Sequence, residues 1–564
     1  MGNISDEKGD PEKALGYYQK TLQFNPDYAG AYSGIGNILP KKGQLDDAIN
    51  YYKRALEFSS NDARLHYNLG NAYREKGQVD NALACYQRAI DLRSDLIEAR
   101  WAHCFSQIPI SYTDFKSIET SRASYHKELI ELYEIISLDK PEDIEAASRV
   151  IGNQQPFYLA YQGYNDRDLQ QIYGPLVCKI MASRFPKFAD RCMLPRHIEG
   201  EALRVGIVSG FFFLHSNWKL PIKGWVENID KRRFNLYGYY TGKIKDEQTT
   251  IGAQNFCRFV EDINHFEELC ETIRRDRLHV LIYPEIGMDP MTVRLAALRL
   301  APVQCTSWGH PETSGLPTID YYLSSDLMEP PDASNHYTEK LIRLPNLSVY
   351  YTPLNIPQMA ASRESFDLRA NSILYFCGQS LYKYLPQYDD IFPRIAREVS
   401  NCQFLVISDP ISAFITEQFR TRLCNIFRKF DMNLNDYVVF LKPLQPYEFY
   451  AVNQLSDIFL DTIGWSGCNS TFEAIANNLP ILTLLGELMR GRHSSAILTM
   501  MGATDTIAKT LDEYIGLAIK LAQDSQWRKL MSEKIAANKH RIYRDKTCIA
   551  ALENFLEAVI KEKL

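Results

Sequence analysis

The segment IFLDTIGWSGCNSTFEAIANNLPILTLLG (residues 458–486) runs from a short apolar stretch, through a loop of small and hydroxyl residues, into a helix-like stretch and a second apolar run. This order is typical of a βαβ unit whose strands are buried in a parallel sheet. Where the loop meets the helix, free backbone N–H groups and the helix dipole favour a phosphate group. The segment therefore predicts an α/β domain with an anion site at the carboxyl end of a strand.

The residues at that helix start are candidates for binding a nucleotide. Asn469, Ser470 and Thr471 would cap a diphosphate. Glu473, one turn further on, could accept hydrogen bonds from the two hydroxyls of a ribose. An ordinary helix cap that binds nothing has the same Asn-Ser-Thr pattern. From this segment alone both interpretations stay open, and the functional one is a nucleotide-sugar donor site.

The alternation of apolar strands and helical stretches continues on both sides of the segment. Between residues 203 and 326 the strand-like runs are LRVGIVSG, FNLYGYYTG, HVLIYPE, VQCTSWG and YYLSSD. After a linker near 352–370 they are SILYFCGQ, CQFLVISD, YVVFLKP, IFLDT and PILTLLG. These two sets predict two Rossmann-like domains, residues 201–360 and residues 361–564 with terminal helices, and a ligand cleft at the carboxyl ends of the strands. Neither set contains a G-x-G-x-x-G pattern, which argues against NAD or FAD.

Residues 1–94 contain a repeat of a different kind. Gly9, Gly43 and Gly77 are spaced by 34 residues, and the phrases EKALGYYQKTLQFNP, DDAINYYKRALEFSS and DNALACYQRAIDLRS align without a gap. Two helices per 34 residues is the tetratricopeptide pattern, with the first repeat incomplete. Such a solenoid presents a groove that binds peptide or protein, and a spacer or dimerisation arm is the alternative. Residues 95–200 lose the repeat and predict a helical transition region.

The composition of the 564-residue chain narrows the class of protein. Its net charge of −6 gives no basic footprint for nucleic acid. No apolar run is long enough for a membrane span, and the N-terminus lacks the apolar region of a secretory signal. The 12 cysteines form no C-x-x-C pair, which argues against a zinc knuckle and a disulfide framework. We therefore expect a cytoplasmic protein with no membrane or nucleic-acid partner.

Several residues at predicted strand ends could carry chemistry, and each has a plainer alternative. Lys383 ends CGQSLYK and could neutralise a departing diphosphate, or be a solvated lysine at a helix start. In KPLQPYEFY, Phe449 or Tyr447 could stack on a base or simply pack. His215, in VGIVSGFFFLHSNWK, could move a proton or donate to a phosphate or sugar hydroxyl, although a structural histidine is the commoner case.

Two further histidines could also be either functional or structural. His279 begins HVLIYPE, and His310 lies in WGHPETSGLPTIDYY, where glycines and prolines hold the backbone rigid. A rigid loop at a strand end can form the wall of a sugar site. Arg492 and His493, which follow PILTLLG, would line the cleft from the other side.

Together with the repeats, five motifs in this order resemble the O-linked N-acetylglucosamine transferases and their SPINDLY relatives (family 41), most closely the bacterial members. The motifs are VGIVSGFFFLHSNWK, APVQCTSWGHPETSGLPTIDYY, FCGQSLYKYLPQ, LDTIGWSGCNSTFEA and GELMRGRHSSAIL. The resemblance implies a GT-B fold, a nucleotide-sugar donor, no cofactor or metal ion, and transfer with inversion at the anomeric carbon. It also implies that the repeats guide a protein acceptor.

The resemblance further implies roles for single residues. Lys383 would hold the diphosphate, and His215 would lie beside the reacting centre. The donor would be bound by Asn469, Ser470, Thr471, Glu473, Gln379, Phe449, Gly309 and His279. The chain departs from the animal enzymes at the helix cap, where Cys468 stands in place of a histidine and Glu473 in place of an aspartate. The identity of the sugar is therefore open.

We expect a protein O-glycosyltransferase that moves N-acetylglucosamine from UDP-GlcNAc to Ser or Thr hydroxyls of proteins. Transfer of glucose from UDP-glucose to asparagine, or of fucose from GDP-fucose, is the alternative within the enzyme class. The alternative of another class is a scaffold of repeats with a degenerate transferase domain. Retention of Lys383, His215 and an acidic ribose partner argues against the scaffold. The repeats could also join copies of the chain into a homo-oligomer.

Overall fold

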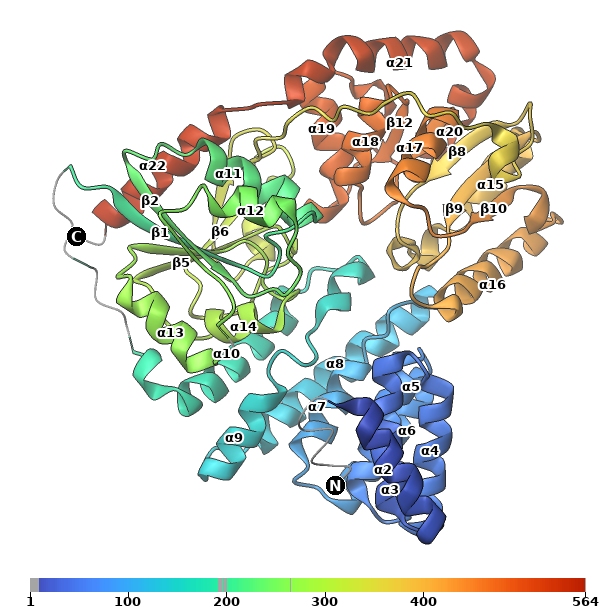
Figure 1. Cartoon of the computed structure of the whole chain (residues 1–564). Helices are drawn as coiled ribbons and strands as arrows, with labels where there is room; N and C mark the ends of the chain where they lie inside the picture. The colour runs from blue at the N-terminus through green and yellow to red at the C-terminus, as the bar shows by residue number, and fades with distance from the viewer. Residues whose placement is uncertain (1–9, 191–194, 196–199, 264, 563–564) are drawn as a thin grey trace. The chain divides into compact units, whose positions relative to one another are not determined.

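The computed structural model describes residues 10–190, 195, 200–263 and 265–562. The chain divides into two compact units. One consists of Met1–Ile110 and Lys116–Pro156, and the other of Ser111–Phe115 and Phe157–Leu564. Figure 1 shows the helices of the first unit in blue to cyan and the two sheets of the second unit in green and in yellow to orange.

The first unit is built on a solenoid of antiparallel helices. They are α2 (Pro11–Phe24), α3 (Ala29–Ile38), α4 (Leu45–Phe58), α5 (Ala63–Glu75), α6 (Val79–Leu92) and α7 (Ile97–Ser106). Small residues allow the helices to approach, since a Cβ added to Gly34 would lie 2.4 Å from the ring of Tyr18. Gly43 closes a turn at a φ of 73°, a conformation that favours glycine. The tetratricopeptide prediction is confirmed, and Gly9 lies outside the described residues.

The predicted transition region, residues 95–200, is shared between the two units. Helices α7 and α9 (Pro141–Val150) and nearly all of α8 (Phe115–Ile135) belong with the solenoid. The short helix η2 (Phe157–Gln162) and α10 (Arg167–Arg184) belong to the second unit. The compact unit that contains the repeats therefore extends well beyond residue 94.

A parallel sheet opens the second unit. Within the described part of residues 203–344 the strand order is β3-β2-β1-β4-β5-β6-β7. The strands are β1 (Leu203–Ser209), β2 (Phe234–Tyr240), β3 (Arg258–Val260), β4 (Val280–Tyr283), β5 (Val303–Ser307), β6 (Tyr321–Ser325) and β7 (Lys340–Leu344). The helices among them are α11 (Lys223–Asn228), α12 (Glu247–Ala253), α13 (Phe266–Arg275) and α14 (Pro290–Ala296). The first Rossmann-like domain is confirmed, and β3 and β7 extend the predicted sheet at its two edges.

A second parallel sheet follows the linker. Its strand order, among the residues described, is β10-β9-β8-β11-β12-β13. The strands are β8 (Ile373–Cys377), β9 (Cys402–Ile407), β10 (Val438–Leu441), β11 (Ile458–Leu460), β12 (Ile481–Leu484) and β13 (Ile507–Ala508). The helices are α15 (Ile391–Glu398), α16 (Ala413–Lys429), α17 (Pro446–Leu455), α18 (Asn469–Ala476), α19 (His493–Met501), α20 (Leu511–Gln523) and α21 (Ser525–Asn538). Because β8 and β11 are neighbours, the loops after them meet at the carboxyl edge.

The last helix, α22 (Thr547–Lys561), packs on the first sheet. Leu552 and Leu556 are 1% and 0% exposed and lie in one apolar cluster with buried residues of β1 and β2. Glu553 adds an ion pair with Arg233 at 2.7 Å. Figure 1 shows α22, in red, beside the green sheet. The terminal helices were expected in the second domain, residues 361–564, but α22 covers the first sheet. This could not be foreseen, because an amphipathic helix does not itself encode which sheet it will cover.

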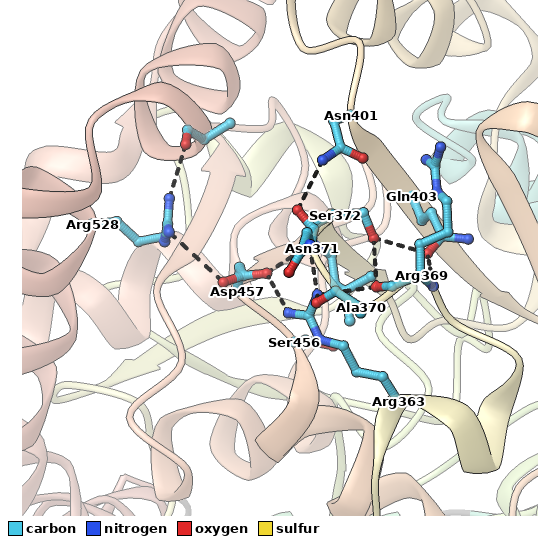
Figure 2. Close-up of polar contacts among 12 residues, drawn as sticks. Arg363, Arg369, Ala370, Asn371, Ser372, Asn401, Gln403, Ser456, Asp457 and Arg528 are labelled. Atoms are coloured by element: carbon cyan, nitrogen blue, oxygen red, sulfur yellow. Dashed lines mark hydrogen bonds and ion pairs between the residues drawn. The ribbon is translucent and has the colours of Figure 1, made fainter.

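The linker before β8 is fastened to the amino edge of the second sheet (Figure 2). The guanidinium of Arg363 donates to the backbone oxygens of Ala370 at 3.0 Å and Ser372 at 2.6 Å, and to Asp457 at 3.2 Å. Asp457 also accepts from the backbone N–H of Leu374 in β8 at 2.9 Å. Polar groups at this edge are thus engaged within the fold, and the opposite, carboxyl edge is where a ligand of such a sheet binds. No helix in the described residues combines the length and apolarity that crossing a bilayer demands.

Candidate functional site

Lys383 lies just beyond β8 at the carboxyl edge of the second sheet. Its Nζ donates to Oε1 of Gln379 at 3.0 Å and lies 5.5 Å from the ring centre of Trp465. Burial lowers the pKa of Lys383 to about 8, against the opposite effect of the Asp461 carboxylate. A largely buried ammonium group with few partners of its own is suited to receive an anion.

The loop between β11 and α18 is held from behind by Asp461. Its carboxylate accepts from Oγ of Ser466 at 2.6 Å, from the backbone N–H of Gly467 at 2.7 Å and from Oγ1 of Thr483 at 2.8 Å. A Cβ added to Gly467 would lie 2.5 Å from Nε2 of Gln379, so this close approach requires glycine. The loop that leads to α18 is therefore fixed before any ligand arrives.

The first two turns of α18 carry the four residues predicted from its sequence. Ser470 accepts a hydrogen bond from Nε2 of Gln379, which links this turn to the Lys383 loop. The hydroxyl of Thr471 is buried between Gly467 O at 2.8 Å and Ser494 Oγ at 2.7 Å, so only its backbone N–H is available to an anion. The helix start thus offers backbone donors and the hydroxyl of Ser470, whose own O–H is not used in the contact with Gln379.

The carboxyl group of Glu473 is oriented by a neighbour on the same helix. Nδ2 of Asn469 donates to its Oε1 at 2.9 Å. The side chain is 9% exposed, and burial raises the pKa of Glu473 to about 7, against the positive charge of Lys219. A carboxyl group at this depth can accept hydrogen bonds from ligand hydroxyls without competition from bulk water.

Phe449 lies at the same edge, on α17. Its ring meets that of Phe376 at 5.1 Å between centroids in an edge-to-face arrangement. A Cβ added to Gly378 would lie 3.3 Å from the tip of the Phe449 ring. Tyr447, the other aromatic candidate, is 59% exposed and is not among the residues packed on this core.

His215 follows β1 at the carboxyl edge of the first sheet. Its Nδ1 accepts from the backbone N–H of Asn217 at 3.1 Å, and its ring lies 4.4 Å from that of Phe211. Burial lowers the pKa of His215 to about 4, with a further contribution from Lys219. The imidazole is therefore neutral at pH 7, and its proton lies on Nε2, which can donate to a ligand.

The loop after β5, which contains Gly309, is also held rigidly in place. The backbone N–H of Gly309 donates to Pro284 O at 3.0 Å, and an added Cβ would lie 2.7 Å from that oxygen. Further along, Glu339 accepts from Thr313 Oγ1 at 2.6 Å and from the backbone N–H of Ser314 at 2.8 Å. The rigidity of the loop thus comes from these contacts as well as from its glycines and prolines.

Loops of the two Rossmann-like domains meet at these residues. The rings of Trp308, next to Gly309, and His493, the first residue of α19, lie 5.7 Å apart. Lys219, four residues after His215, acts on the carboxyl group of Glu473. The Gly309 loop and the segment that follows His215 therefore lie near the edge that carries Lys383, Gln379, Phe449 and α18 in the other domain.

His279 does not join this group. It immediately precedes β4, at the amino edge of the first sheet, where its Nδ1 accepts from the backbone N–H of Arg204 at 2.9 Å. In a parallel sheet that edge is opposite to the one that carries His215. The predicted donor contact of His279 conflicts with this geometry, because a histidine that begins a strand cannot also lie beyond its end.

The comparison with protein families finds a match that covers both Rossmann-like domains. Residues 185–353 and 350–547 match glycosyl transferase family 41. The chain belongs to glycosyl transferase family 41. Residues 36–74 and 63–96 match tetratricopeptide repeats, in agreement with the helices of the first unit.

The curated relatives include plant and bacterial proteins. The probable UDP-N-acetylglucosamine–peptide N-acetylglucosaminyltransferase SPINDLY of Hordeum vulgare is 26% identical over 398 residues, which are 68% of this chain and 40% of the relative. The UDP-glucose:protein N-beta-glucosyltransferase of Actinobacillus pleuropneumoniae is 23% identical over 300 residues, 52% of this chain and 46% of the relative. The chain thus spans less than half the length of these curated relatives.

A solved O-GlcNAc transferase has a similar fold. A mutant of the Thermobaculum terrenum O-GlcNAc transferase superposes with a TM-score of 0.67 at 21% identity, covering 100% of this chain and 96% of that one. At this identity the likeness establishes the fold, which is tetratricopeptide helices followed by a GT-B pair of Rossmann-like domains.

Sequence reasoning missed two residues that shape this site. Asp461 is one, and the signal was present, since a carboxylate ends the apolar run IFLD directly before a loop of small residues. Tyr161 is another, since its ring stacks on that of Trp465 at 4.0 Å from the short helix η2. Nothing local in residues 157–162 indicates that contact, which depends on a partner some 300 residues away.

Proposed function

We propose that the chain is an inverting glycosyltransferase that moves a sugar from a nucleotide diphosphate donor to hydroxyl groups of proteins, without a metal ion. The observation that carries the proposal is the link between Lys383, Gln379 and Ser470. It joins a largely buried cation to the backbone donors of a helix start. Lys383 and the backbone N–H groups at the start of α18 together form a cradle for two phosphate groups, which we call the donor cradle. The family assignment makes a nucleotide sugar the natural ligand of this cradle.

The reaction follows from this cradle. An acceptor hydroxyl attacks the anomeric carbon, the bond from that carbon to the diphosphate oxygen breaks, and the proton of the hydroxyl passes to the departing diphosphate or to water. The nucleoside diphosphate leaves with the bonding electron pair. Lys383 and the start of α18 stabilise its growing charge, which is the largest electrostatic demand of the transition state. His215, whose Nε2 carries the proton, donates to the phosphate or the sugar and positions them.

The donor we propose is UDP-GlcNAc, and the acceptor is a Ser or Thr hydroxyl. The names of the plant relatives support N-acetylglucosamine. UDP-glucose with an asparagine acceptor has support in the name of the bacterial N-glucosyltransferase, and GDP-fucose remains the third donor to test. Glu473 would contact the ribose, Phe449 the base and Gly309 the sugar.

We further propose that the first unit captures the acceptor protein. A hollow of about 620 Å³ lies along α2, α3 and α5 and is lined in part by Tyr28, Ser33, Asn37 and Asp62. Aromatic, hydroxyl, amide and carboxylate groups together can bind an extended peptide through both backbone and side chains. A cytoplasmic location and self-association through the repeats stay predictions.

The test is a donor panel followed by a turnover assay. The purified chain is heated with UDP, GDP, UDP-GlcNAc, UDP-glucose or GDP-fucose, and unfolding is followed. A ligand at about 100 times its Kd adds roughly 2.7 kcal/mol, which shifts the midpoint measurably. The proposal expects a selective response to uridine nucleotides and release of UDP in the presence of acceptor proteins. Stabilisation by no nucleotide would instead favour the scaffold of repeats with a degenerate domain.

A further inference from the structure

His493 is a buried histidine with an unused nitrogen beside the proposed donor cradle. It is the first residue of α19 and is 4% exposed. Its Nδ1 lies 3.2 Å from the backbone oxygen of Ser466, and its ring lies against that of Trp308. Nε2 has no hydrogen-bond partner among the residues that the structure describes. A buried polar atom left unpaired costs stability, so its retention calls for a role in binding.

The protonation state of this ring follows from its surroundings. A backbone oxygen only accepts, so Nδ1 of His493 must carry a proton to form the contact with Ser466. Burial lowers the pKa of His493 to about 4, and the charge of Lys383 adds to the effect. The imidazole is therefore neutral at pH 7, with a lone pair on Nε2. Such an atom accepts a hydrogen bond, and a phosphate offers it no proton, whereas a hydroxyl does.

The neighbours of His493 place it beside the proposed donor cradle, against the loop of Gly309 that we propose to contact the sugar. Ser466 is two residues from the start of the α18 cap, and Trp308 adjoins Gly309 in the fixed loop of the first domain. Ser494, the next residue, donates its backbone N–H to Ser466 Oγ at 2.8 Å and so ties α19 to the same loop. His493 thus lies where the loops of both domains meet and where a group attached to the diphosphate would extend.

We propose that Nε2 of His493 accepts a hydrogen bond from a hydroxyl of the transferred sugar and thereby helps to select that sugar. The inference rests on the proposed function and deepens it. It makes His493 a specificity-determining residue, in addition to the diphosphate contacts of Lys383 and α18. It also gives a physical basis for sugar recognition where Cys468 supplies only a weak donor.

Two substitutions separate the role of Nε2 of His493, which we propose binds the sugar, from that of Nδ1, which contacts Ser466. His493→Asn keeps an amide N–H near the position of Nδ1 for Ser466 but has nothing at Nε2. His493→Gln places a polar group near the position of Nε2 instead. The matched control is His540→Asn in the same domain, since its Nδ1 also contacts a backbone oxygen, that of Ala537 at 3.0 Å, but its side chain is exposed.

Titration calorimetry of each full-length variant with UDP and with UDP-GlcNAc tests the proposal. In His493→Asn we expect the Kd for UDP-GlcNAc to rise roughly three- to tenfold, the value of one neutral hydrogen bond, with the Kd for UDP unchanged. His493→Gln should recover part of the loss, and His540→Asn should match the wild type. In a series of monodeoxy UDP-sugars, one analogue should weaken binding to the wild type but not further weaken binding to His493→Asn.

Other outcomes overturn the proposal. Equal weakening of UDP and UDP-GlcNAc would make His493 a support of the diphosphate loop. Unchanged binding with a lower kcat would make it a proton acceptor for the attacking hydroxyl. If the wild type binds neither UDP nor UDP-GlcNAc, the proposed UDP-sugar function itself fails, which is a separate result from the loss of a sugar contact.

Discussion

Burial and a neighbouring charge act in opposite directions on the pKa of the Lys383 ammonium group. Burial lowers its pKa to about 8, whereas Asp461 favours the charged form. Lys383→Met keeps the volume and removes the charge, so we expect kcat to fall by roughly 100-fold or more while the chain still folds. In the proposed mechanism only the protonated lysine holds the diphosphate, so kcat/KM of the wild type should decline as pH rises through about 8.

A matched control for this prediction is Lys529→Met, which alters a lysine that is 77% exposed on α21. Its kinetics should equal those of the wild type across the same pH range. Full turnover in Lys383→Met, measured as UDP release with a protein acceptor, would remove Lys383 from the mechanism.

Glu473 gives a prediction about stability. Its pKa is raised from 4.5 to about 7, so the folded state binds more protons than the unfolded state between these values. Stability contributed by this group is therefore greatest at low pH and is lost as pH rises through about 7. Glu473→Gln removes the buried charge and keeps an acceptor for Asn469. We expect it to stabilise the free chain at pH 8 by about 2 kcal/mol, with little gain at pH 5.

Denaturant unfolding at the two pH values measures this difference. The same variant should bind UDP more weakly, because a neutral amide is a poorer acceptor for the two ribose hydroxyls than a carboxylate. A gain in stability that is equal at pH 5 and pH 8 would assign it to packing rather than to the buried charge.

Secondary-structure elements with a strong local signal were predictable. The 34-residue repeat fixed the solenoid, and runs such as LRVGIVSG and SILYFCGQ were apolar enough to identify β1 and β8. The start of α18 followed from Asn469 and its neighbours. The edge strand β3, only three residues long, lacks a signal above background.

What could not be predicted depends on distant contacts. The position of His279 relative to a cleft requires the direction of β4, and the sheet that α22 covers requires the assembled core. Tyr161 reaches Trp465 only because η2 packs in the same unit. Each of these contacts joins residues far apart in the chain, and local periodicity carries no information about such pairs.

The packing of α22 on the first sheet can be tested directly. Leu556 is fully buried in the core of that sheet, so Leu556→Ala should cost about 2–5 kcal/mol through lost burial and a cavity. Leu530→Ala, on α21, is the control, because Leu530 is 54% exposed and its truncation should cost less than about 0.5 kcal/mol. Urea unfolding of both variants measures the difference, and equal costs would place α22 outside the core.

At the scale of the whole molecule, the two units offer different kinds of surface. The second unit gathers cations, backbone donors and a buried carboxyl group at one edge of each sheet, which suits a small anionic donor. The first unit offers an open hollow of about 620 Å³ with mixed polar and aromatic lining, which suits a chain rather than a small molecule. Donor chemistry and acceptor capture are therefore expected to respond to separate substitutions.

Ser33, on α3, allows that separation to be measured. It lines the hollow and is half-buried, so Ser33→Glu would place an unpaired carboxylate in the proposed contact with an acceptor. We expect kcat/KM for protein acceptors to fall about tenfold, equivalent to about 1.4 kcal/mol, while UDP binding and hydrolysis of the donor stay unchanged. Ser60→Glu adds the same charge at an exposed position that does not line the hollow, and its rates should match the wild type. If Ser33→Glu left acceptor kinetics intact, or weakened UDP binding as well, the hollow would not be where acceptor proteins bind.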